Sequence, residues 1–290
     1  MITEFEITKD SSPYGIAFGD DDAFWFTQNK GNKIGRITSK GEVVEFPVPT
    51  EHAGLSSIVK GANELWFTES LGNKIGKIDY KGNIQEYDLK HENSGVFGIA
   101  HNPKNNSVWF TLMNSNRIGH LDASNRYSEF VIPYELSYPS YITIDENENI
   151  WFTLNQTNSI GKLDSKGRFK NIPIPSEKSG PVGICVGPQD SIWFVEILGN
   201  KIGKVNSDYT IEEYELQTPN AKPHAITYNG EDKLWFTQWE ANKIANIDLD
   251  GNIHEFDLPT KNSEPHGIAI GHDEIYVALE CGKIAVLKIL

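Results

Sequence analysis

Residues 192–203 read Ile192-Trp193-Phe194-Val195-Glu196-Ile197-Leu198-Gly199-Asn200-Lys201-Ile202-Gly203, a short apolar strand followed by a Gly-Asn turn and the start of a second strand. Six further copies of this pattern lie in the chain, and each begins with an aromatic residue. These residues are Trp25, Trp66, Trp109, Trp151, Trp193, Trp235 and Tyr276, at intervals of 41, 43, 42, 42, 42 and 41 residues. A period of about 40 to 45 residues is typical of a four-stranded propeller blade. The sequence therefore predicts a seven-bladed β-propeller.

Every part of the repeat has strand character. An inner strand follows motifs such as Pro181-Val182-Gly183-Ile184, the aromatic strand comes next, and Gly-Asn and Asp-x-x-Gly turns introduce two further strands. We therefore expect an all-β fold of four-stranded antiparallel blades, forming a single domain over residues 1–290. The last copy ends at residues 283–287 without an outer strand, whereas residues 2–7 resemble the outer strands of other copies. The N-terminal strand is predicted to complete the last blade and to close the ring.

Charge and composition argue against several classes of partner. The chain has 26 Lys and Arg against 40 Asp and Glu, a formal net charge of −14, whereas nucleic-acid binding requires clustered basic residues. The N-terminus lacks a basic and apolar leader, and no stretch approaches the length of a membrane span. Cys185 and Cys281 have no metal-type spacing and are expected to be free thiols. We expect a cytoplasmic monomer without nucleic-acid or membrane partners.

Ring positions that depart from the repeat indicate a functional site, because equivalent residues of successive blades share one structural task. The residue two places before the inner-strand Ile is, in blade order, Tyr14, Ser56, Phe97, Ser140, Val182, His224 and His266. His224 and His266 thus place two imidazoles on adjacent blades. Glu264 lies two residues before His266, so both side chains point the same way if the segment around Pro265 is extended. The turn containing Glu280 is one residue shorter than in blade six, which is expected to redirect this acid toward the same place.

Other polar and aromatic groups have simpler explanations. The six remaining histidines are expected to be solvated or hydrogen-bonded, and Asp20-Asp21-Asp22 lacks the spaced ligands of a calcium loop. Cys281 has no assigned base, so it is a weak candidate nucleophile. Five aromatic residues are expected near the same mouth, that is, the opening at the end of the ring where His224 and His266 lie. There they either contact an apolar ligand or pack against the inner wall of the ring. They are Tyr14, Phe97, Tyr138, Tyr141 and Trp239.

The chain resembles the virginiamycin B lyase family. The motifs that carry the resemblance are Pro223-His224-Ala225-Ile226, Glu264-Pro265-His266-Gly267-Ile268 and Glu280-Cys281, and the similarity extends over essentially the whole chain. The resemblance implies a seven-bladed propeller that binds Mg²⁺. It also implies a lyase that inactivates type B streptogramin antibiotics, because elimination at the ester bond makes the cyclic depsipeptide linear.

Residue roles follow from the same resemblance. It implies that Glu264 and Glu280 bind the metal, that His266 accepts the proton and that His224 binds substrate. Tyr14, Tyr138 and Trp239 are expected to contact the antibiotic. Three residues of blade six depart from the family pattern of Glu, Gly and Gly, and they leave the four motif residues intact. The departures are Gln238, Glu240 and Ala245.

Two other functions are consistent with the same residues. A metal-dependent esterase or lactonase would open the ester with a metal-activated water. A propeller can also act as a ligand-binding platform without catalysis. The mass of the product separates the two reactions, because elimination yields an isomer of the substrate and hydrolysis yields a product heavier by one water.

Overall fold

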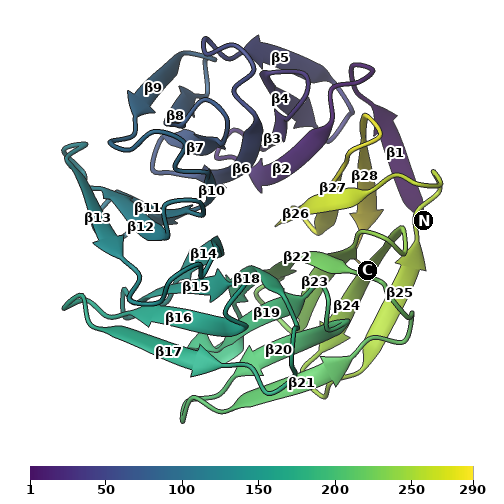
Figure 1. Cartoon of the computed structure of the whole chain (residues 1–290). Helices are drawn as coiled ribbons and strands as arrows, with labels where there is room; N and C mark the ends of the chain where they lie inside the picture. The colour runs from purple at the N-terminus through teal and green to yellow at the C-terminus, as the bar shows by residue number, and fades with distance from the viewer. Residues whose placement is uncertain (290) are drawn as a thin grey trace.

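The computed structural model of the chain describes residues 1–289 and contains a closed ring of seven sheets (Figure 1). Each sheet has four antiparallel strands, and in blades one to six the strands follow one another in chain order. The first strand of each blade faces the centre of the ring (Figure 1). The one helical element in residues 1–289 is the short 3-10 helix η1 (Pro188–Asp190). The predicted all-β, seven-bladed propeller is confirmed.

The strands of the first four blades have the following bounds. Blade one contains β2 (Pro13–Phe18), β3 (Ala23–Gln28), β4 (Lys33–Thr38) and β5 (Val43–Pro47). Blade two contains β6 (Leu55–Lys60), β7 (Glu64–Glu69), β8 (Lys74–Asp79) and β9 (Ile84–Asp88). Blade three contains β10 (Val96–Asn102), β11 (Ser107–Leu112), β12 (Arg117–Leu121) and β13 (Tyr127–Val131). Blade four contains β14 (Pro139–Ile144), β15 (Ile150–Leu154), β16 (Ser159–Leu163) and β17 (Phe169–Pro173).

The remaining blades complete the ring. Blade five contains β18 (Pro181–Val186), β19 (Ile192–Glu196), β20 (Lys201–Val205) and β21 (Ile211–Glu215). Blade six contains β22 (Pro223–Tyr228), β23 (Lys233–Gln238), β24 (Lys243–Asp248) and β25 (Ile253–Asp257). Blade seven contains β26 (Pro265–Gly271), β27 (Glu274–Leu279), β28 (Lys283–Lys288) and β1 (Ile2–Glu6). In the part of the chain that the structure describes, no helix has the length and apolar character that a membrane crossing requires.

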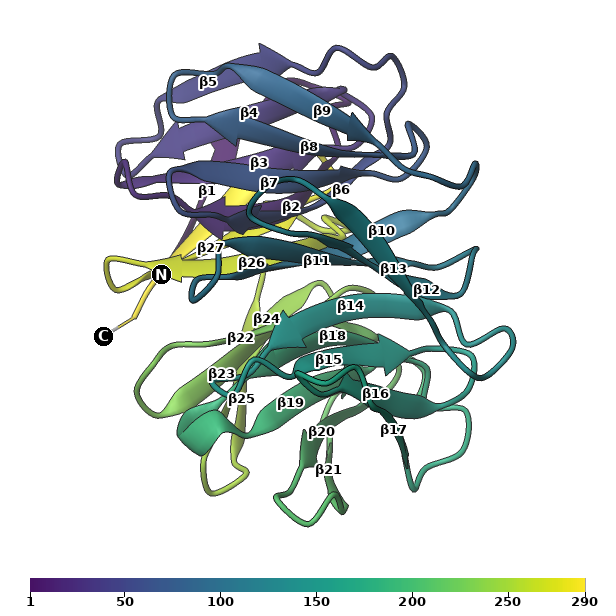
Figure 2. The same ribbon diagram turned by 90° about the vertical axis from the view of Figure 1, so that its left-hand side faces the viewer.

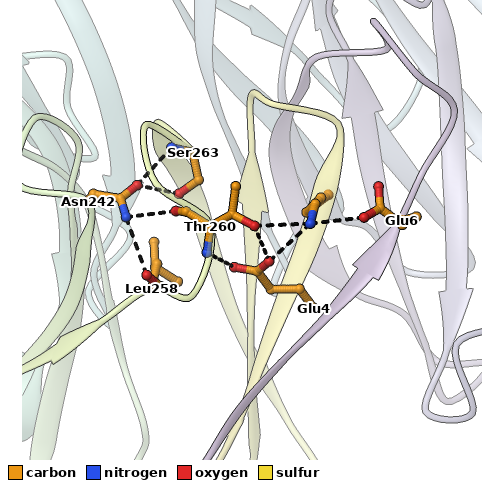
Figure 3. A network of polar contacts seen from close by, with 7 residues as sticks. Glu4, Glu6, Asn242, Leu258, Thr260 and Ser263 are labelled. Carbon is orange, nitrogen blue, oxygen red and sulfur yellow. Dashed lines mark hydrogen bonds and ion pairs between the residues drawn. The ribbon is translucent and has the colours of Figure 1, made fainter.

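Strand β1 is the outer strand of blade seven and pairs antiparallel with β28. Figures 1 and 2 show the N-terminal end of the chain beside this blade. A polar network holds β1 in place (Figure 3): Glu4 accepts hydrogen bonds from the backbone N–H and the hydroxyl of Thr260. The ammonium of Lys283 lies 3.3 Å from Glu4 and 2.9 Å from Glu6. The prediction that the N-terminal strand completes the last blade is confirmed.

In blades one to six the Trp and Phe of the second strand pack between blades, as their alternation predicts. Trp25 joins a core cluster formed mainly by residues of blade two, whereas Phe26 joins a cluster with residues of blade seven. The phenylalanine ring also requires space on the neighbouring strand. A Cβ atom on Gly203 would lie 2.1 Å from the ring of Phe194, so a larger residue there would force this ring to move.

The last residue of the second strand is Glu69 in blade two and Gln238 in blade six, and the two side chains have different polar partners. In blade six the amide of Gln238 donates a 2.9 Å hydrogen bond to Glu255. In blade two the equivalent residue is Glu69, which is fully buried and has no hydrogen-bond partner for either oxygen in residues 1–289. Burial, followed by repulsion from Glu86, raises the pKa of Glu69 to about 8. Glu196 of blade five has the same environment, and its pKa is also raised to about 8.

We expect Glu69→Gln to stabilise the protein at alkaline pH, because glutamine stays neutral and can donate to Glu86. The pKa of the folded carboxyl exceeds its ordinary value of 4.5, so the folded state loses stability as pH rises from about 4.5 through about 8. The melting temperature of the variant should therefore exceed that of the parent by about 5 °C at pH 9 and by little at pH 5. Thermal melts at both pH values measure this difference.

A matched control removes the same charge from the surface. Glu51 is exposed, so Glu51→Gln should leave the difference between the two pH values close to that of the parent. Equal stabilisation by Glu69→Gln at pH 5 and pH 9 would contradict the assignment of a buried, protonated carboxyl.

Candidate functional site

Each blade begins with a residue in the left-handed conformation directly before its inner strand. These residues have φ between 50° and 64° and are Ser12, Gly54, Gly95, Tyr138, Gly180, Lys222 and Glu264. In each blade the carbonyl of this residue accepts a hydrogen bond from the residue that follows the second strand. The left-handed region favours glycine, which three of the blades have here, whereas Glu264 is the one acid among the seven residues. The condition that the segment around Pro265 is extended holds from Pro265 onward, because Pro265 lies in β26, whereas Glu264 itself has a left-handed backbone. The turn, and not strand alternation, therefore brings Glu264 to the side of His266.

The same hydrogen bond aligns Glu280 with its counterparts in other blades. The N–H of Glu280 donates to the carbonyl of Glu264 at 3.1 Å, as the N–H of Trp239 donates to that of Lys222 at 3.0 Å. Glu280 is thus the equivalent of Trp239, and the shorter turn leaves it at the start of the loop. Across the seven blades this position holds one acid. Its occupants are Asn29, Ser70, Met113, Asn155, Ile197, Trp239 and Glu280.

Glu264, His266 and Glu280 converge at the inner end of blade seven. One ligand atom of each residue lies within 4.8 Å of those of the other two. His266 Nε2 lies 2.9 Å from Glu280 Oε2, and the side chain of His266 is buried while that of Glu280 is 25% exposed. The hydrogen bond with His266 lowers the pKa of Glu280. Burial and the neighbouring Glu280 raise the pKa of Glu264.

His224 and Tyr14 form the wall beside this cluster, from the inner strands of blades six and one. The hydroxyl of Tyr14 lies 3.3 Å from His224 Nε2, and the Tyr14 ring stacks on His266 with centroids 4.2 Å apart. The two imidazoles are 4.7 Å apart. Burial, followed by repulsion from His266, lowers the pKa of His224 to about 3, so this imidazole is neutral at pH 7. Burial raises the pKa of Tyr14, so its phenol keeps its proton.

The other predicted contact residues lie at different distances from His266. The Trp239 ring is 6.4 Å from the His266 ring, and the ammonium of Lys222 lies 5.0 Å from the centre of a Trp239 ring. Tyr138 is 37% exposed and lies before β14, across the ring from β26 (Figure 1). Phe97 and Tyr141 complete an aromatic lining, with Phe97 6.0 Å from Tyr14. The structure thus brings Tyr14, His224 and Trp239 to His266 and leaves Tyr138 on the opposite rim.

Lys30 is a further member of the site, and no sequence motif predicted it. It lies in the turn between β3 and β4 of blade one, and its ammonium is 3.1 Å from Glu280 Oε1. Lys30 is the one basic residue at its position in the seven blades, so it departs from the repeat as the two histidines do. Its counterparts in blades two to seven are Leu71, Asn114, Gln156, Leu198, Glu240 and Cys281.

The donor set of the cluster fits a divalent cation. Two carboxylates supply the oxygen ligands that Mg²⁺ prefers, and few protein ligands leave coordination positions for water or substrate. In residues 1–289 this is the one group of three acidic, His or Cys ligands close enough to hold a metal. Cys281, beside Glu280, is exposed and free, and partial burial raises the pKa of its thiol, which weakens it as a nucleophile.

A separate groove of about 740 Å³ lies between blades four and five and shares no residue with the cluster. Some of its lining residues contact one another, since the indole of Trp151 donates to Asp145 and the ammonium of Lys162 lies 4.7 Å from the Trp151 ring.

Comparison with known proteins gives full-length matches. A profile of the virginiamycin B lyase family matches residues 1–287. The structure of selenomethionine-substituted virginiamycin B lyase from Staphylococcus aureus is 41% identical with a TM-score of 0.96, over 100% of this chain and 99% of that one. A streptogramin B lyase structure is 43% identical with a TM-score of 0.96, over 100% and 98% of the two chains. A third structure, 41% identical, contains a catalytically inactive His-to-Ala variant of the S. aureus protein with quinupristin.

Sequence matches to curated relatives are shorter. The virginiamycin B lyase of Bordetella pertussis is 49% identical over 49 residues, which is 17% of this chain and 16% of that protein. The S. aureus relative is 42% identical over 50 residues, 17% of each chain. These alignments span about a sixth of the length of the curated relatives. A hydrazine synthase from Kuenenia stuttgartiensis is 11% identical over 99% of this chain and 97% of that one, with a TM-score of 0.80, and shares the fold alone.

Proposed function

The chain belongs to the virginiamycin B lyase family, and on this premise we propose that it inactivates type B streptogramin antibiotics by opening their cyclic depsipeptide at the ester bond. The observation that carries the proposal is the convergence of Glu264, His266 and Glu280 within 4.8 Å at the mouth of the propeller. A relative's structure with quinupristin supports a streptogramin as the substrate.

The proposed reaction is an elimination. The ester links a threonine side-chain oxygen to a carboxyl group, so the departing group is a carboxylate that needs no proton at neutral pH. The base removes the proton from the threonine α-carbon, a carbon–carbon double bond forms, and the bond from the β-carbon to oxygen breaks with its electrons on the carboxylate. Removal of the weakly acidic α-proton is the difficult step, and it requires a base whose pKa lies near the working pH.

His266 is the proposed base. Its Nε2 faces the carboxylates, whereas Nδ1 is buried and has no hydrogen-bond partner in residues 1–289. To accept the α-proton, Nε2 must present a lone pair, which requires the tautomer with its proton on Nδ1. A single histidine-to-alanine change inactivates the S. aureus relative, which supports a histidine in the central role.

Glu264 and Glu280 are the residues that would hold Mg²⁺. When bound there, the ion would stabilise the negative charge that develops on the carbonyl oxygen beside the α-carbon and would engage the Glu280 oxygens that otherwise face His266. Glu264 directly precedes β26 and Glu280 directly follows β27, so both lie at the open end of this hairpin. The hydrogen bond between their backbones holds them together. The left-handed backbone at Glu264 directs its carboxylate to the same side as Glu280.

The wall residues are proposed to bind and orient the antibiotic. His224 is neutral and can donate one hydrogen bond to a substrate carbonyl or to the departing carboxylate. The stacked Tyr14 limits the movement of the His266 ring. Trp239 and Tyr138 are proposed to contact apolar rings of the antibiotic from two sides of the mouth. We also propose a cytoplasmic monomer, and the two free cysteines are consistent with a reducing compartment.

Incubation of the purified protein with a type B streptogramin tests the function. We expect a linear product with the mass of the cyclic substrate, because elimination adds no atoms. A chelator should stop turnover and added Mg²⁺ should restore it, as mass spectrometry of timed samples would show. A product heavier by one water would favour the esterase or lactonase alternative. No turnover under any of these conditions would favour a ligand-binding propeller.

A further inference from the structure

Lys30 reaches the metal-binding pair from the neighbouring blade. Its Nζ lies 3.1 Å from Glu280 Oε1, while His266 Nε2 lies 2.9 Å from the other oxygen, Oε2. The Glu280 carboxylate therefore contacts the ammonium group of Lys30 through one oxygen and the imidazole of His266 through the other. The side chain of Lys30 is 66% exposed, so its ammonium can move into water without unfolding any element.

The repeat shows that Lys30 has no structural task common to the blades. Residues at its position in other blades are apolar, amide-bearing, acidic or a thiol, and they include Leu71, Gln156 and Glu240. The contact with Glu280 is thus particular to the junction of blades one and seven. It places a positive charge on one of the two carboxylates proposed to hold Mg²⁺.

We propose that Lys30 competes with the divalent cation for Glu280 and thereby weakens binding of the cation at this site. The inference rests on the function proposed above. A cation that binds Glu280 Oε1 must displace the ammonium, because two positive charges within a few ångströms repel each other. Cation binding and release of Lys30 are therefore linked, and each opposes the other by the same factor.

The ammonium of Lys30 also affects the electrostatics of the site while it is paired with Glu280. The ligand atoms of Glu264 and Glu280 are within 4.8 Å of each other, so two ionised carboxylates there repel each other. Lys30 offsets part of this repulsion. Because the pair is exposed, salt screens it, and the competition should weaken as ionic strength rises.

Calorimetric titration with Mg²⁺ alone tests the proposal. Lys30→Met keeps the aliphatic stem and removes the charge, so it should bind Mg²⁺ about three- to tenfold more tightly than the parent at low salt. The gain should shrink at high salt. Lys222→Met is the matched control, because Lys222 lies at the same mouth but pairs with Glu240 at 3.3 Å. This control should change the affinity by less than about twofold.

The outcomes separate this inference from the proposed function. Unchanged or weaker Mg²⁺ binding in Lys30→Met, with a parent site that Glu264→Gln abolishes, would overturn the role of Lys30 alone. An equal gain in Lys222→Met would also overturn it, because the effect would then come from overall charge. Absence of any Mg²⁺ site in both the parent and Lys30→Met would overturn the metal-dependent function and the inference together. Thermal melts of each variant confirm that the fold is retained.

Discussion

The His266→Ala variant is expected to lose turnover of a type B streptogramin by about a thousandfold or more, because it lacks the proposed acceptor of the α-proton. The antibiotic should still bind, within about tenfold of the parent affinity, since the wall formed by Tyr14 and His224 remains. Product formation under saturating Mg²⁺ and calorimetric binding of the antibiotic measure the two effects separately.

Two further measurements distinguish a base from a structural residue. Free imidazole should restore part of the lost rate in His266→Ala, because it can enter the space that the ring vacates and accept the proton. His254→Ala alters an exposed histidine of blade six and should keep the parent rate. A near-normal rate in His266→Ala, with the fold intact, would refute the assignment of the base.

Deletion of residues 1–7, which removes β1, is expected to have the largest effect on stability. Strand β28 would lose its outer partner, and the core cluster that contains Ile284 would lose Phe5 and Ile7. Because native domains are only marginally stable and an unpaired strand edge can pair with other chains, we expect an aggregated or unfolded product at 37 °C. Circular dichroism and size-exclusion chromatography report both outcomes.

A milder variant separates the strand from its polar network. Glu4→Ala keeps β1 but removes the acceptor for Thr260 and the partner of Lys283, which should cost about 1 to 3 kcal/mol in the free energy of unfolding. Denaturant melts measure that cost. A deletion variant that remains monomeric with the parent melting temperature would contradict the role of β1 in closing the ring.

The periodic features of the fold could be predicted from the sequence. The spacing of Trp193 and its counterparts predicted the number of blades, and the resemblance of residues 2–7 to other outer strands predicted the closing strand. Both rest on repetition, which reports the same packing task in every unit. The convergence of Glu264, His266 and Glu280 was predicted for the same reason, since each departs from its ring.

Other features depend on geometry that no residue pattern reports. The left-handed backbone of Glu264 follows from a turn shared by all seven blades, in which three blades have glycine and four have larger residues. The contact of Lys30 with Glu280 joins residues 250 positions apart in the chain. Burial raises the pKa of Glu69, and that burial depends on how neighbouring residues pack around the carboxyl. Strand alternation alone does not predict whether this carboxyl lies in water or in the core.

The three residues of the proposed reaction lie in or beside the one blade that draws strands from both ends of the chain. During synthesis, β1 leaves the ribosome before the other strands of the ring and can pair with β28 only after the intervening blades have been made. A nascent chain can therefore assemble six blades in order while the framework around His266 is still incomplete. Activity against the antibiotic would then appear only after β28 has been synthesised and has paired with β1. Enzymatic activity would therefore indicate that the ring has closed.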